Sequence, residues 1–138
     1  MTAIIGIDLG SKRVGCAVAT AGVATPVAAL DRKGDDAEDA AAIRGIADER
    51  GAGTVVLGHP RRLDGTTGPA AEEAERFAGA LRAVGLDVVL WDERLTTVEV
   101  ERSMIAGGAR RARRRRSIDA AAATVILQSY IDTVGWPS

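Results

Sequence analysis

Three acidic residues fall at the ends of predicted elements. Asp8 ends an apolar run, Glu93 follows another, and Asp119 lies in the first turn of the last predicted helix. Carboxylates held close together repel one another unless a divalent cation neutralises them. The chain has one His and one Cys, too few for a conventional zinc site, so any metal must be an oxygen-ligated Mg²⁺ or Mn²⁺. Two such ions about 3.5–4 Å apart could activate a water and stabilise the leaving oxygen of a phosphodiester.

Each carboxylate also has a simpler explanation. Asp8 could cap the turn that carries Ser11, and Glu93 could pair with Arg94 at the surface, which contributes little energy. Asp119 could only stabilise the start of its helix, by roughly 0.3–1 kcal/mol. Because all three are expected to meet at one edge of the β-sheet predicted below, the metal site is the favoured interpretation.

Asp92 and His59 are candidate auxiliary residues. Adjacent residues of an extended chain point in opposite directions, so the metal is assigned to Glu93, and Asp92 is expected to order the loop or support the site. Histidine side chains can gain or lose a proton near neutral pH, so His59 could move a proton. Packing in the loop or contact with substrate is the favoured role of His59.

Basic residues gather in one part of the chain. Residues 1–109 sum to −5, whereas residues 110–116 contain six arginines. Guanidinium groups bind phosphates in a bidentate manner without reading sequence, so this run is predicted to be a nucleic-acid-binding loop whose affinity falls steeply with salt. Gly10 and Gly15 would let a polyanion approach the turn beside Asp8. The predicted phosphate-binding residues are Lys12, Arg13, Arg61, Arg62, Arg110, Arg111, Arg113, Arg114, Arg115 and Arg116.

Apolar runs and turn residues predict a mixed α/β sheet with helices on both faces. A third helix is expected to open at Thr96-Thr97-Val98-Glu99, and Ser117 is expected to cap the last one. Residues 58–68 are predicted to form a long loop. If the first and fifth strands are parallel and central, Asp8 and Glu93 point into one crevice. The predicted strands are 3–9, 13–20, 23–30, 54–57 and 87–91, and the other predicted helices are 37–50, 69–83 and 118–133.

The 138 residues are most simply one domain, 1–138, with a core over 1–134 and a frayed tail over 135–138. No apolar stretch is long enough to cross a membrane, and the start lacks the features of a signal peptide. The single cysteine, Cys16, is expected in the core and suits a reducing cytoplasm.

Four motifs follow one another along the chain: Gly6-Ile7-Asp8-Leu9-Gly10-Ser11-Lys12-Arg13-Val14-Gly15, Gly58-x-Pro60…Asp64-Gly65-Thr66, Asp92-Glu93-Arg94-Leu95-Thr96-Thr97 and Ile118-Asp119-x-Ala121-Ala122. In this order they resemble the YqgF/RuvX family of Holliday-junction-resolvase-like nucleases. The resemblance implies an RNase H-like fold, with a five-stranded sheet of order 3-2-1-4-5. It also implies a cytoplasmic, metal-dependent nuclease with Asp8, Glu93 and Asp119 as catalytic residues. The family is associated with 5′-end maturation of the small-subunit (16S) rRNA precursor, and some members are described as junction resolvases. His59 and Arg61-Arg62 depart from the family pattern.

Two other functions compete with that of a nuclease. The Asp-Leu-Gly-Ser-Lys stretch resembles the phosphate loop of actin-like and Hsp70-like ATPases, but 138 residues cannot supply the second domain that those proteins need. A non-catalytic nucleic-acid-binding factor is also possible, and the intact acidic trio argues against it. The sequence leaves open whether the substrate is an rRNA precursor or branched DNA, and whether the chain acts alone or as a homodimer.

Overall fold

A computed structural model describes residues 2–62, 64–95 and 111–137. Its centre is a five-stranded sheet of order β3-β2-β1-β4-β5, which confirms the predicted order. β1 pairs antiparallel with β2 and parallel with β4, while β2–β3 is antiparallel and β4–β5 is parallel. The strands are β1 (Ala3–Leu9), β2 (Arg13–Thr20), β3 (Val23–Asp31), β4 (Ala52–His59) and β5 (Asp87–Asp92).

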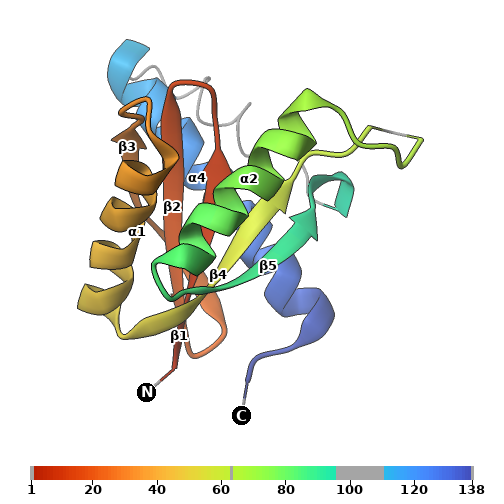
Figure 1. Cartoon of the computed structure of the whole chain (residues 1–138). Helices are drawn as coiled ribbons and strands as arrows, with labels where there is room; N and C mark the ends of the chain where they lie inside the picture. Colours follow the sequence, from red (N-terminus) through yellow and green to blue (C-terminus); the bar gives the residue numbers. More distant parts are fainter. Residues whose placement is uncertain (1, 63, 96–110, 138) are drawn as a thin grey trace.

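Helices cover both faces of the sheet, as predicted (Figure 1). α1 (Asp36–Arg50) and α2 (Pro69–Ala83) lie on one face, where Ile43 and Phe77 pack against Ile7 and Leu57. α4 (Arg111–Val134) lies on the other face, where Leu127 belongs to a second core cluster. Since side chains alternate along a strand, even-numbered residues of β1 and β4 face α4 and odd-numbered ones face α1 and α2.

β4 is longer than predicted. Gly58 and His59, expected to open a loop, continue the strand because they pair with Trp91 and Asp92 of β5. β5 is the edge strand rather than a central one, so β4 separates it from β1. The strand that carries Asp8 and the strand that leads to Glu93 are therefore separated by β4.

The start of the last helix was predicted wrongly. α4 begins at Arg111, so the backbone of the arginine run forms helical turns instead of a loop, and Ser117 is not its cap. Arginine is a good helix former, and no Gly or Pro interrupts residues 111–134. Asp119 consequently lies in the third turn rather than the first, and the helix-dipole argument for it does not hold. Arg110 and the helix expected at Thr96 lie outside the described residues.

The end of the chain is attached to the core as far as it is described. Gly135 adopts a left-handed conformation (φ 100°) and its N–H donates to the carbonyl of Ile131 at 2.8 Å, which closes α4. Trp136, expected in a frayed tail, packs against the cluster beneath α4. None of the helices in the described ranges is both long and apolar enough to cross a membrane.

Candidate active site

Asp8 lies near the C-terminal end of β1, the central strand, and is half-buried. As an even-numbered residue it shares the α4 face with Ile4. Its partner across the antiparallel pair is Gly15 of β2. On the other side, the register of β1 and β4 continues toward Gly58. Asp8 is therefore flanked on both neighbouring strands by glycines, which leave room above the sheet for other groups.

Glu93 fills the room above Gly58. It is the first residue of a short 3₁₀ helix, Glu93–Leu95, that follows β5 directly. A Cβ atom at position 58 would collide with Oε1 of Glu93 and would lie 2.8 Å from Cδ1 of Ile126. The carboxylate of Glu93 therefore extends over the end of β4 toward the strand that carries Asp8.

Asp119 approaches the sheet above Gly15. A Cβ atom at position 15 would lie 2.5 Å from the carbonyl carbon of Asp119, so the group that approaches this glycine closely is the backbone of α4. The side chain of Asp119 accepts a hydrogen bond from Nε of Arg13 at 2.6 Å, and both side chains are about a quarter exposed. Arg13, expected to bind phosphate, is thus also the partner of a predicted catalytic carboxylate.

The three predicted catalytic carboxylates therefore share one face and one end of the sheet. Their oxygen atoms are the donors that Mg²⁺ and Mn²⁺ prefer. Within the described part of the chain, however, no three or more His, Cys, Asp or Glu side chains form a group that could hold a metal ion. The chemistry of the three carboxylates fits such a metal ion. Because the Asp119 side chain is directed to Arg13, it would have to turn toward Asp8 and Glu93 to form the metal site.

Asp92 is oriented away from this group. It accepts hydrogen bonds from the backbone N–H of Arg94 at 2.9 Å and from the Arg94 guanidinium at 2.5–3.0 Å. These hydrogen bonds hold the pKa of Asp92 below its ordinary value and raise the pKa of Arg94. Asp92 thereby orders the turn that begins at Glu93. The assignment of the metal to Glu93 stays a prediction.

His59 lies on the opposite face from the three carboxylates. Its neighbour Gly58 faces α4, so the His59 side chain faces α2. There its Nε2 lies 3.6 Å from Oε1 of Glu75, and only 13% of the side chain is exposed. This position favours packing against α2 over a role in proton transfer.

The predicted phosphate-binding residues lie on two loops and at the start of α4. Ser11 and Lys12 are exposed in the turn between β1 and β2, and Arg61 and Arg62 are exposed in the loop after β4. The guanidinium of Arg62 lies over Gly68, 3.0 Å from where a Cβ atom would stand. The backbone of the predicted arginines within residues 111–116 is helical.

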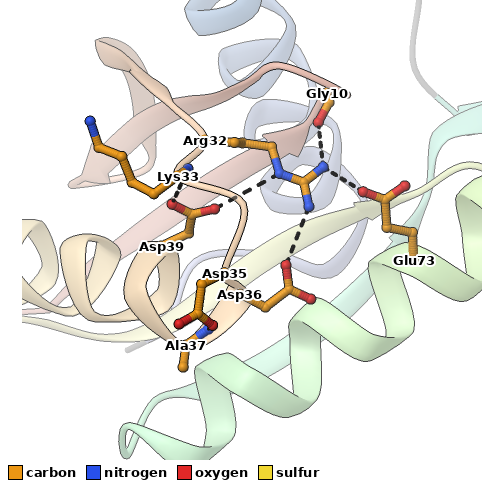
Figure 2. A network of polar contacts seen from close by, with 8 residues as sticks. All are labelled: Gly10, Arg32, Lys33, Asp35, Asp36, Ala37, Asp39 and Glu73. Atoms are coloured by element: carbon orange, nitrogen blue, oxygen red, sulfur yellow. Dashed lines mark hydrogen bonds and ion pairs between the residues drawn. The ribbon is translucent and has the colours of Figure 1, made fainter.

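Arg32 was not among the predicted site residues. Its guanidinium donates to the carbonyl of Gly10 at 2.8 Å, and its backbone N–H donates to the carbonyl of Lys12 at 2.9 Å. Figure 2 shows the first of these bonds, to Gly10. Arg32 therefore contacts both ends of the turn beside Asp8. No sequence pattern indicated it, because Arg32 stands in a polar stretch that read only as a turn.

Comparisons with known proteins agree with one another. A family model described as "RuvX: Holliday junction resolvase" matches residues 2–133. A relative from Geobacillus kaustophilus, named "Putative pre-16S rRNA nuclease", is 46% identical over 135 residues, which cover 94% of this chain and 96% of the relative. A relative of the same name from Pelotomaculum thermopropionicum is 42% identical over 137 residues, which cover 97% and 89%.

Among solved structures, T. thermophilus RuvC in complex with a Holliday junction substrate resembles this chain with a TM-score of 0.60. The sequence identity is 14%, and the likeness covers 97% of each chain. At this identity the likeness concerns the fold, which is RNase H-like, as the sequence resemblance implied.

Proposed function

The chain belongs to the RuvX family, and on that premise we propose that it is a nuclease that cleaves the 16S rRNA precursor near its 5′ end. Relatives at 42–46% identity over nearly the whole chain carry the name of a pre-16S rRNA nuclease. The observation that carries the proposal is the gathering of Asp8, Glu93 and Asp119 on one sheet face, beside exposed basic loops. We propose that this cleavage takes place in the cytoplasm.

Asp8, Glu93 and Asp119 would hold the Mg²⁺ or Mn²⁺ ions. When bound, a pair of such ions supplies an activated water and stabilises the leaving oxygen of a phosphodiester. The protein contributes the orientation of the three carboxylates. The central strand fixes Asp8, and the turn that Asp92 and Arg94 order fixes Glu93. The contact of α4 with Gly15 fixes the backbone of Asp119, whose side chain would turn from Arg13 to the ions.

The basic residues would bind the phosphates that flank the cleaved bond. Lys12 and Arg13 follow Asp8 closely in the chain, and Arg61 and Arg62 lie in the loop that leaves the neighbouring strand. Such contacts hold the backbone of a structured RNA without reading bases.

The experiment compares wild type with Asp8→Asn on an RNA that spans the 5′ precursor and the start of 16S rRNA, with Mg²⁺ or Mn²⁺. The amide keeps the shape of the side chain and removes its charge, so cleavage should fall by at least about a hundredfold. Asp87→Asn is the matched control, because Asp87 is exposed at the opposite end of β5. Cleavage that survives Asp8→Asn would falsify the mechanism.

A four-way DNA junction is the second substrate, since the family model is described as a Holliday junction resolvase. Cleavage of the junction but not of the RNA would favour that alternative function. Binding without cleavage of either substrate would favour a non-catalytic nucleic-acid-binding factor.

A further inference from the structure

Arg32 joins the turn beside Asp8 to the rest of the fold. The carbonyls of Gly10 and Lys12 bracket Ser11, and Arg32 donates to both of them, one through its side chain and one through its backbone. Gly10 also donates to the carbonyl of Arg13 at 2.9 Å, so the turn is closed within itself. One residue from the end of β3 thus restrains both ends of the turn.

The Arg32 guanidinium is itself held by carboxylates from two helices (Figure 2). It pairs with Glu73 of α2 and with Asp36 and Asp39 of α1, at 3.3 Å and 3.9 Å for the latter two. Asp39 is 5% exposed and also accepts the backbone N–H of Lys33 at 3.0 Å. The turn beside Asp8 is therefore fixed to both helices of the opposite face.

The charge on Arg32 is retained in this setting. Burial disfavours the charged form, but the hydrogen bond and charge of Glu73, together with Asp36, outweigh it and raise the pKa of Arg32. Only 14% of the side chain is exposed. A charged donor to a backbone carbonyl makes a stronger hydrogen bond than a neutral one, so the restraint on Gly10 is a strong one.

The surroundings of Arg32 do not suit a phosphate. A hollow of about 430 Å³ lies beside the turn, and the two basic side chains that line it are matched by two carboxylates. With no excess of positive charge, the hollow has little attraction for a polyanion. Arg32 therefore acts through the turn rather than on the substrate. The lining residues are Ser11, Lys12, Arg32, Gly34, Asp36 and Glu73.

We propose that Arg32 is a positioning residue of the nuclease. By holding the Gly10–Lys12 turn against α1 and α2, it fixes Asp8 on one side of the turn and Arg13 on the other. This inference rests on the proposed function. It adds to it a residue that touches neither the metal ligands nor the phosphates.

The test is Arg32→Lys. Lysine keeps the positive charge among Asp36, Asp39 and Glu73, but it lacks the planar fork that reaches a carbonyl and a carboxylate together. Losing the hydrogen bond to Gly10 should lower kcat about tenfold. RNA affinity measured without metal should stay within about twofold, because Arg32 contacts no phosphate in this scheme. Hydrogen exchange should rise about tenfold at the amides of position 10 and position 32, which donate to the carbonyls of Arg13 and Lys12.

Arg44→Lys is the matched control. Arg44 lies on α1, pairs with Asp48 at 2.9 Å and, like Arg32, donates to a backbone carbonyl, that of Val84 beyond the far end of α2. It makes the same kinds of bond away from the turn, so its replacement should leave kcat and the exchange of the Gly10 and Arg32 amides unchanged.

Three outcomes separate the possibilities. Unchanged exchange at the turn in Arg32→Lys overturns the positioning role, whatever the activity. An equal loss of kcat in Arg44→Lys also overturns it, because the effect would then be general loss of stability. A wild-type protein that cleaves neither substrate contradicts the proposed function alone, since the exchange measurement does not depend on cleavage.

Discussion

Gly58→Ala should lower the cleavage rate strongly and the stability of the fold only slightly. The added Cβ would collide with the carboxylate of Glu93 and press on Cδ1 of Ile126 at 2.8 Å. Both groups are the far ends of flexible side chains, so they can move without moving the backbone. The carboxylate of Glu93 therefore leaves its position over β4, while the strand itself stays paired with β1 and β5.

The size of the effect follows from the overlap. Carbon and oxygen atoms not bonded to each other rest about 3.5 Å apart, so Oε1 of Glu93 must retreat by about an ångström. A misplacement of that size at a reacting centre can cost about a hundredfold in rate. Overpacking costs about 1–3 kcal/mol in general, and the lower end applies because Glu93 is only half-buried. The fall in Tm should thus be about 4 °C.

The assay measures cleavage of the rRNA precursor fragment and thermal unfolding of the same samples. Gly53→Ala is the matched control. It lies on the same strand, and a Cβ atom there meets nothing within 4 Å. Replacing glycine in a strand by alanine at such a position is neutral or stabilises by up to about 1 kcal/mol. Gly53→Ala should therefore cleave as well as wild type.

Wild-type cleavage by Gly58→Ala would refute the reasoning, since Glu93 would then not need its observed position. A loss of Tm much larger than about 4 °C would also contradict it. In that case the alanine would act on the packing of α4 through Ile126 rather than on the carboxylate of Glu93.

Two further predictions concern stability and reactivity. Gly15→Ala meets the backbone of α4 at Asp119, which cannot rotate away, so we expect a loss of about 3 kcal/mol, or roughly 10 °C in Tm by circular dichroism; an unchanged Tm would contradict the close contact. Burial raises the pKa of Cys16 from 9.0 to about 12, so the thiol should resist a thiol reagent at pH 8 until the protein is unfolded in guanidinium. The thiol ionises at a lower pH in the unfolded chain than in the folded protein. The contribution of Cys16 to the free energy of unfolding is therefore complete below pH 9 and is lost as the pH rises toward 12. Rapid modification of the native protein would show that Cys16 is more accessible than the structure indicates.

Much of the fold could be predicted from local sequence. The first three strands follow from apolar runs separated by short Gly-containing turns, and the helix Pro69–Ala83 from the proline at its start and Gly85 after its end. The choice between Asp92 and Glu93 followed from the alternation of an extended chain. The structure shows Asp92 bound to Arg94, and the assignment of the metal to Glu93 stays a prediction. These features depend on neighbours in the sequence, which is why a pattern could indicate them.

The parts that were missed depend on distant partners or on competing local signals. Ser117 is a good cap only if the residues before it are not helical, and the arginines before it are helix formers. The bond between Arg13 and Asp119 joins residues 106 positions apart. Gly58 appeared to end a strand because its partner, Trp91, belongs to a strand that follows much later.

The glycines on the α4 face explain how the acidic residues come together. A Cβ atom at Gly6 would lie 2.6 Å from Cβ of Leu127, and Gly15 and Gly58 make similarly close contacts with α4 or with Glu93. All three glycines lie on the same face of the sheet. Each stands two positions from a residue of the core cluster beneath α4, and side chains two positions apart on a strand point to the same face. Larger side chains would hold α4 further from the sheet and would lift Asp119 away from the end of β1. The depth at which α4 packs, rather than the order of the acidic residues in the sequence, therefore brings Asp119 to the level of Asp8.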